Sequence, residues 1–79
     1  MDWREYIEQR PDVMLGKPVI KGTRMTVELI LDKLGGGVSV QELLESYPQL
    51  RPEHIQAAQA FAADYIGFDE KVWVSDLAG

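Results

Sequence analysis

"TVELILDKLGGGVSVQELLESYP", residues 26–48, decides the fold, because it predicts two short helices separated by a glycine turn. The apolar residues of its first half recur at i, i+3, i+4 and i+7, the stripe of an amphipathic helix: Val27, Ile30, Leu31 and Leu34. Thr26 is a suitable N-cap, and Glu28 places negative charge in the first turn, where the helix dipole favours it. The glycines at 35–37 end this helix, since glycine adopts the left-handed conformation at little cost.

A second helix is predicted directly after the glycines. Ser39 and Glu42 have the S-x-x-E spacing of a capping box, in which side chains and backbone N–H groups satisfy each other at a helix start. The apolar stripe then repeats: Val40, Leu43, Leu44 and Tyr47. Pro48 closes the helix, because proline cannot continue it.

A third helix is predicted from Pro52, which suits a first helical position, to the stop signal at Gly67. Its inward face carries small and large apolar residues: Ile55, Ala58, Phe61, Ala62, Tyr65 and Ile66. The linker before it is tight and holds one apolar residue, Leu50, that can fill the core. This is the outline of a helix-turn-helix, although any small three-helix bundle has a similar one.

The chain before and after these helices is predicted to be more extended. "DWREYIEQR" forms one helical turn with Trp3, Tyr6 and Ile7 packing inward, and "VML" with "PVI" forms a small β-hairpin or an extended arm around Gly16-Lys17. The last residues, "FDEKVWVSDLAG", form a short strand or a docking peptide. We therefore expect one domain, residues 1–79, that is mainly α: an arm or hairpin (1–25), a three-helix core (26–67) and an acidic-aromatic tail (68–79).

Composition limits the classes of function. A 79-residue chain has a small core and gains stability by pairing with a partner. It has no cysteine, no apolar run long enough for a membrane span and an acidic start unlike a signal peptide, so we expect a cytoplasmic protein without disulfides and without contact to a membrane.

The charge is unevenly distributed. The net charge of −5 argues against broad affinity for nucleic acid, which comes from neutralising phosphates. Residues 10–24 nevertheless hold four cations against one acid, a balance of +3: Arg10, Lys17, Lys21 and Arg24 against Asp12. From residue 64 onward four acids face one cation, a balance of −3: Asp64, Asp69, Glu70 and Asp76 against Lys71. This polarity suits two different partners.

Familiar catalytic and cofactor motifs do not fit. Five residues separate Gly16 from Gly22, where a P-loop has four, and Gly22 is followed by Thr23 rather than lysine, so the segment is not a nucleotide-binding P-loop. The only histidine, His54, is expected to be exposed at the start of the third helix, and it has no second histidine or cysteine to join in a metal site or a nucleophile–base pair. We expect no metal, no cofactor and no enzyme activity.

The order of these motifs resembles the family called domain of unknown function 433. The resemblance covers residues 6–67 and is most specific at four places: "GKPVI" (16–20), "GTR" (22–24), "YP" (47–48) and "IQAA" (55–58). It implies a homeodomain-like or winged-helix-like helix-turn-helix and a role like that of VapB antitoxins, which are encoded beside PIN-like nuclease toxins. Arg51, where a serine or threonine commonly caps the third helix, and Asp12 after Pro11 depart from the family pattern.

The resemblance implies a homodimeric regulator that binds its own promoter with modest affinity and holds a PIN-like toxin. Phosphates and bases would be contacted by the arm, the linker and the start of the third helix: Lys17, Lys21, Arg24, Arg51, His54, Gln56 and Gln59. The tail lies outside the resemblance, and from its own composition we expect its apolar residues to hold the toxin: Phe68, Val72, Trp73 and Val74. The alternative is a protein-binding module without DNA-binding activity, which the acidic balance and a third helix without lysine or arginine favour.

Overall fold

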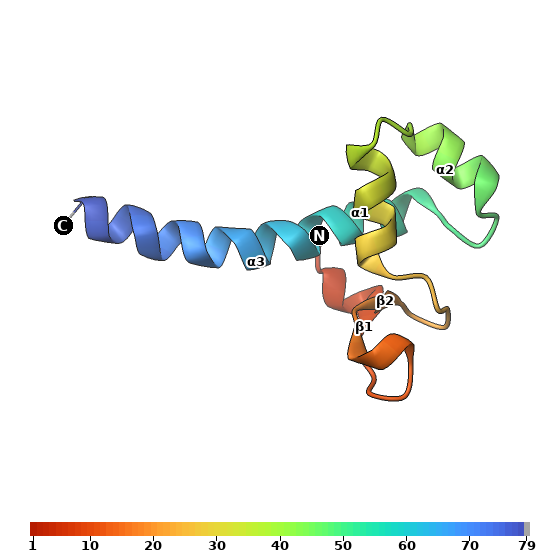
Figure 1. The fold of residues 1–79 in the computed structure, drawn as a ribbon, viewed down its shortest axis with the longest axis horizontal. Helices are drawn as coiled ribbons and strands as arrows, with labels where there is room; N and C mark the ends of the chain where they lie inside the picture. Colours follow the sequence, from red (N-terminus) through yellow and green to blue (C-terminus); the bar gives the residue numbers. More distant parts are fainter. Residues whose placement is uncertain (79) are drawn as a thin grey trace.

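The computed structural model describes the backbone of residues 1–78 and the side chains of residues 1–67. Within that range the protein is mainly helical, as expected, with three α-helices, a two-stranded hairpin and two 3-10 turns (Figure 1). In chain order the elements are η1 (Trp3–Glu5), β1 (Ile7–Glu8), η2 (Met14–Gly16), β2 (Val19–Ile20), α1 (Val27–Gly35), α2 (Val40–Ser46) and α3 (Pro52–Ala78).

Both short helices begin at the residues that the capping pattern predicts. The N–H of Leu29 donates to Oγ1 of Thr26 at 3.0 Å, and the N–H of Glu42 donates to Oγ of Ser39 at 3.1 Å. The glycine triplet ends α1 as predicted, and Gly37 has a φ of +97°, which a residue with a side chain rarely adopts. Local sequence therefore determines α1, α2 and the turn between them.

The hairpin forms, but its first strand is not the predicted one. β1 pairs antiparallel with β2, so that Ile7 lies opposite Ile20. Residues 13–15, predicted as a strand, do not form one, because Met14 and Leu15 lie in the η2 turn with φ values of +48° and +59°, in the left-handed region that an extended strand cannot use. Pairing β2 with β1 buries Ile7, whereas Leu15 remains exposed.

β2 connects the hairpin to α1. Val19 and Ile20 are fully buried, and the segment before α1 runs back along them: the N–H of Ile20 donates to the carbonyl of Met25 at 2.9 Å, and the N–H of Val27 donates to that of Pro18 at 3.0 Å. Pro18 lacks an N–H, but in this position only its carbonyl is needed. The N-terminal segment is therefore part of the domain rather than a separate arm.

The core lies where α1, α2, the hairpin and the first half of α3 meet. Its most deeply buried large side chains are Ile20, Ile30, Leu43 and Val19, and Ala57 and Ala58 let α3 approach closely. Leu50, in the linker between α2 and α3, is 5% exposed and fills the core as predicted. Burying a leucine of this kind stabilises the fold by about 1.5–3 kcal/mol.

α3 is longer than the sequence pattern predicts. The stop expected at Gly67 is wrong, because the helical backbone continues through this residue to Ala78. A glycine inside a helix costs about 1 kcal/mol relative to alanine, but it ends a helix only where the chain turns into the left-handed conformation. Gly67 has no positive φ, and the following residues are helical, so the short strand expected near Val72 is also wrong.

The N-terminus is fastened to the middle of α3. Trp3 packs edge-on against Phe61, with 4.7 Å between ring centroids, and its Nε1–H donates to a carboxylate oxygen of Asp64 at 2.7 Å. The guanidinium of Arg4 lies over the same indole ring. The expected inward packing of Trp3, Tyr6 and Ile7 is confirmed. This contact marks the end of the compact part, beyond which α3 projects (Figure 1).

Candidate functional site

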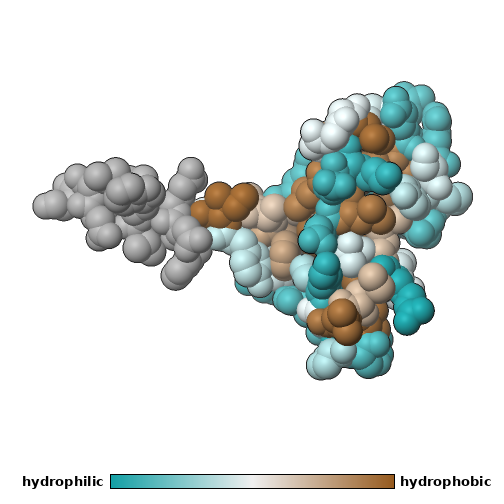
Figure 2. All heavy atoms as spheres, in the orientation of Figure 1, coloured by the Kyte–Doolittle hydropathy of each residue, from teal (hydrophilic) through white to brown (hydrophobic). Residues whose placement is uncertain are grey.

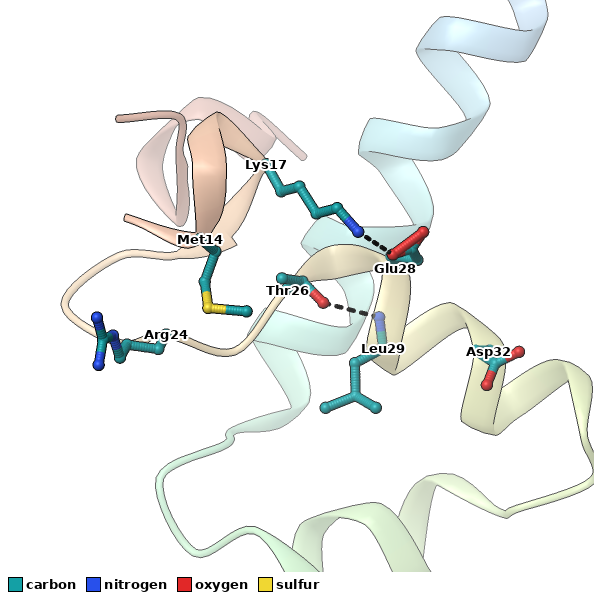
Figure 3. A pocket seen from close by; sticks show the side chains of 7 residues that line it. All are labelled: Met14, Lys17, Arg24, Thr26, Glu28, Leu29 and Asp32. Carbon is teal, nitrogen blue, oxygen red and sulfur yellow. Dashed lines mark hydrogen bonds and ion pairs between the residues drawn. The ribbon is translucent and has the colours of Figure 1, made fainter. Parts of the chain in front are cut away.

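An open groove of about 450 Å³ lies between the turns around β2 and the first half of α1 (Figure 3). Glu28, Leu29 and Asp32 line it from α1. Met14, Lys17 and Arg24 line it from the segments on the other side, with Thr26 between them. Val27 and Ile30 of the same helix point into the core, so the groove is on the outer side of α1.

Local backbone geometry presents the two cations of the groove. Lys17 follows Gly16 (φ +81°) and Arg24 comes shortly after Gly22 (φ +77°), so a left-handed glycine turns the chain before each of them. Thr23 fixes the second turn, because its hydroxyl donates to the carbonyl of Ile20 at 2.8 Å and accepts from the N–H of Met25 at 3.0 Å. Lys17 and Arg24 are consequently exposed while Met25 is buried.

The groove is electrically balanced rather than cationic. Nζ of Lys17 lies 2.8 Å from Oε1 of Glu28, so Lys17 is the ion-pair partner of Glu28 (Figure 3). The two side chains are 51% and 70% exposed, and an ion pair of this kind contributes about 0–1 kcal/mol to stability. Asp32 and Arg24 lie at opposite ends of the groove (Figure 3). Two carboxylates thus offset the two cations.

The remaining predicted cations lie outside the groove. Lys21, beside the β2 turn, and Arg51, just before α3, are both exposed. Neither forms an ion pair with any side chain that the structure describes. Together with Arg24 of the groove, they are the predicted phosphate contacts that form no ion pair with a described side chain.

His54 has a structural role at the start of α3. Its Nδ1 accepts the N–H of Arg51 at 3.0 Å, the position in which a glutamate or glutamine completes a capping box. Its ring also lies edge-on to Tyr6, with 6.0 Å between centroids. The expectation of an exposed His54 is wrong, since the side chain is half-buried.

The two predicted base contacts lie on the outer side of α3. Gln56 and Gln59 are exposed, while their neighbours Ile55 and Ala58 are buried. No residue of α3 up to Gly67, the last whose side chain the structure describes, lines the groove. The structure therefore separates the predicted contacts into three: Lys17 and Arg24 in the groove, Lys21 beside β2, and Arg51 with the contacts on α3.

Two exposed apolar side chains were missed by the sequence pattern. Leu15 is 95% exposed and Met14 42% exposed, both in the left-handed η2 turn. Figure 2 shows hydrophobic side chains at the surface of this end of the molecule and again where α3 leaves the compact part. Tyr65 and Ile66, predicted on the inward face of the third helix, are 57% and 63% exposed, so that prediction is wrong for both. The glycine directly after "VML" was the one sequence signal for a turn there.

The predicted toxin-binding residues Phe68, Val72, Trp73 and Val74 lie outside the residues whose side chains the structure describes. Within the described part of the chain, no three acidic or histidine side chains converge so that they could hold a metal ion. Each helix within residues 1–78 lacks the length of apolar sequence that crossing a membrane requires.

Comparison with known proteins places the chain in a family. The "Uncharacterized protein y4eO" of Sinorhizobium fredii (strain NBRC 101917 / NGR234) is 37% identical over 59 residues, which make up 75% of this chain and 27% of that protein. The crystal structure of a duf433 member protein from Anabaena variabilis ATCC 29413 superposes with a TM-score of 0.67 at 27% identity, over 92% of this chain and 68% of the other. Residues 7–62 match the family described as "Protein of unknown function (DUF433)", and the chain belongs to that family.

Proposed function

We propose that this chain is an antitoxin-like regulator that acts as a homodimer. In this proposal α2 and α3 form a homeodomain-like helix-turn-helix on DNA, and the projecting end of α3 holds a PIN-like nuclease toxin. The two activities would reside in different parts of the chain, the compact part and the projecting helix.

The observation that carries the proposal is the projection of α3. This helix has 27 residues and therefore a length of about 40 Å, in a molecule whose longest extent is 48 Å. Its last buried side chain with a described position is Phe61, and Ala63, Asp64, Tyr65 and Ile66 are all exposed. Single helices are only marginally stable in water without packing, so the projecting end requires a partner surface.

The sequence of the projecting end indicates the character of that partner. Residues 64–79 combine four acids and one lysine with several aromatic and branched side chains. A nuclease binds a polyanion, and its cleft attracts acidic groups for the same reason. An acidic, apolar helix is therefore suited to covering such a cleft.

The DNA-binding half is supported by the arrangement of α2, the linker and α3. A recognition helix contacts base edges with its N-terminal residues, and here Gln56 and Gln59 are exposed in that part of α3. Glutamine can bind adenine with two hydrogen bonds. Lys21 and Arg51 would supply the contacts to phosphate, twice in a dimer, which predicts modest affinity.

One observation favours the alternative of a protein-binding module without DNA. The exposed side of the first turns of α3 carries Glu53 and no lysine or arginine, and Lys17 of the groove is paired with Glu28. Phosphate binding weakens steeply with salt, with a slope of about −0.9 per neutralised phosphate, whereas an apolar protein contact has no such slope. Salt dependence therefore separates the two functions.

The test uses the full chain and a variant that ends at Gly67. Both are titrated with the duplex from upstream of their own gene and with a scrambled duplex, with and without the protein of the neighbouring reading frame. The regulator predicts selective binding of the upstream duplex by both chains, and capture of the neighbouring protein by the full chain only. Absence of selective binding under every condition contradicts the DNA-binding half, and equal capture by both chains contradicts the role of α3.

A further inference from the structure

The η2 turn holds an apolar side chain away from the core. Met14, Leu15 and Gly16 have φ values of +48°, +59° and +81°, and the first two of them are residues for which this region is unfavourable. Backbone bonds keep the turn closed: the N–H of Gly16 donates to Val13 at 3.0 Å, and that of Lys17 donates to Met14 at 3.1 Å. The result is a fixed turn with Leu15 95% exposed.

The groove lies directly beside this turn. Met14, the residue before Leu15, is part of the groove lining, and Leu29 provides a second apolar side chain there. A protruding leucine and a partly apolar groove therefore occupy neighbouring positions on one surface. Such a surface can pair with a copy of itself across a two-fold axis, because the leucine of each copy can enter the groove of the other.

The charges of the groove have the same self-complementary arrangement. Arg24 is at one end and Asp32 at the other, with Thr26 and Leu29 between them (Figure 3). Neither Arg24 nor Asp32 forms an ion pair with a side chain that the structure describes. A two-fold axis across the middle of the groove exchanges its ends, so each Arg24 meets an Asp32. A duplex, with charge of one sign, matches only half of this groove.

We propose that the groove and the η2 turn form the homodimer interface, with Leu15 of each copy entering the groove of the other beside Leu29. Arg24 of one copy pairs with Asp32 of the partner subunit. The interface leaves Lys21, Arg51 and the outer side of α3 outside it. The inference shares with the proposed function only the homodimer, and it is tested without DNA or toxin.

The first measurement is sedimentation equilibrium of the full chain over about two decades of protein concentration. Leu15→Gly should weaken the dimer on the order of a hundredfold, because both copies lose a buried leucine. Glycine also suits the positive φ, so the melting temperature measured at low concentration, where the monomer dominates, should not fall. Val40→Ser, which changes another exposed apolar residue on α2, is the matched control and should leave the dimer unchanged.

The second measurement tests the pairing of charges. Arg24→Glu and Asp32→Arg should each weaken the dimer, and the variant with both changes should restore it, because the two charges exchange places across the axis. A chain that is monomeric throughout, a dimer that Leu15→Gly does not weaken, or a double variant that does not recover would overturn the proposal. A monomer that loses affinity for a different protein after Leu15→Gly would also overturn it and assign the surface to that protein.

Discussion

Lys21 and Lys17 are both exposed lysines near the N-terminus, and under the proposed function we expect only Lys21 of the two to contribute to DNA binding. Lys17 is held 2.8 Å from Glu28, so its charge is already offset, whereas Lys21 forms no ion pair with the described side chains. We therefore predict that Lys21→Ala reduces the salt dependence of DNA affinity and that Lys17→Ala leaves it unchanged.

The size of the effect follows from the number of phosphates. One lysine on each copy of a dimer neutralises two phosphates, so Lys21→Ala should make the slope of log K against log salt shallower by about 1.8. Between about 50 and 200 mM salt, the wild type should then lose about twelvefold more affinity than the variant. Because Lys21 is exposed, its replacement should change the free energy of unfolding by less than about 0.5 kcal/mol.

The assay is fluorescence anisotropy of the labelled upstream duplex at several salt concentrations, with sedimentation confirming that both variants keep the oligomeric state of the wild type. Equal reductions of the slope by the two substitutions would show that Glu28 does not neutralise Lys17. An unchanged slope for Lys21→Ala, in a protein that does bind the duplex, would remove Lys21 from the interface and refute the reasoning.

Three further predictions concern stability. Thr26→Ala should lower the free energy of unfolding by about 1–2 kcal/mol and the melting temperature by roughly 4–16 °C. The loss should exceed that of Ser39→Ala, because the Thr26 cap is buried and the Ser39 cap is exposed, and thermal denaturation of both variants checks this order. Leu43→Ala removes a side chain that is 1% exposed and should lower the free energy of unfolding, measured in urea, by about 2–5 kcal/mol without changing the secondary structure at low denaturant. A loss below about 1 kcal/mol would contradict the packing of Leu43 in the core. His54→Ala should lower the free energy of unfolding, measured in urea, by about 0.5–2 kcal/mol. His54→Gln should keep most of the stability, since the glutamine side chain can also accept a hydrogen bond from the N–H of Arg51. Equal losses in the two variants would show that Nδ1 does not cap the helix.

Much of the helical part could be predicted from sequence because its signals are local. Thr26 and Ser39 are each three residues from the N–H that they accept, and the glycine triplet directly follows the last apolar residue of α1. The burial of Leu50 was also predicted correctly, since it is the one apolar residue of a short polar linker between two helices that pack on the same core. Because these partners are only three or four residues apart along the chain, the local sequence is enough to specify the contact.

The incorrect predictions concern contacts between distant residues or choices that local rules leave open. The strand next to β2 was predicted among its near neighbours, but the chain uses Ile7, thirteen positions before Ile20, because that pairing buries both isoleucines. His54 was predicted exposed because its neighbours are polar, yet it packs on Tyr6 and accepts the N–H of Arg51. Gly67 was predicted to end α3, but a glycine can be either a stop or an interior residue.

The sequence by itself determined where α1 and α2 lie, where α3 begins, and that the chain carries cations near one end and acids near the other. Only the tertiary structure decided which cations remain unpaired and which apolar side chains face solvent. The reason is physical: a cap or a helical stripe involves neighbours along the chain, whereas the pairing of Lys17 with Glu28 and the exposure of Leu15 depend on how distant segments are packed together.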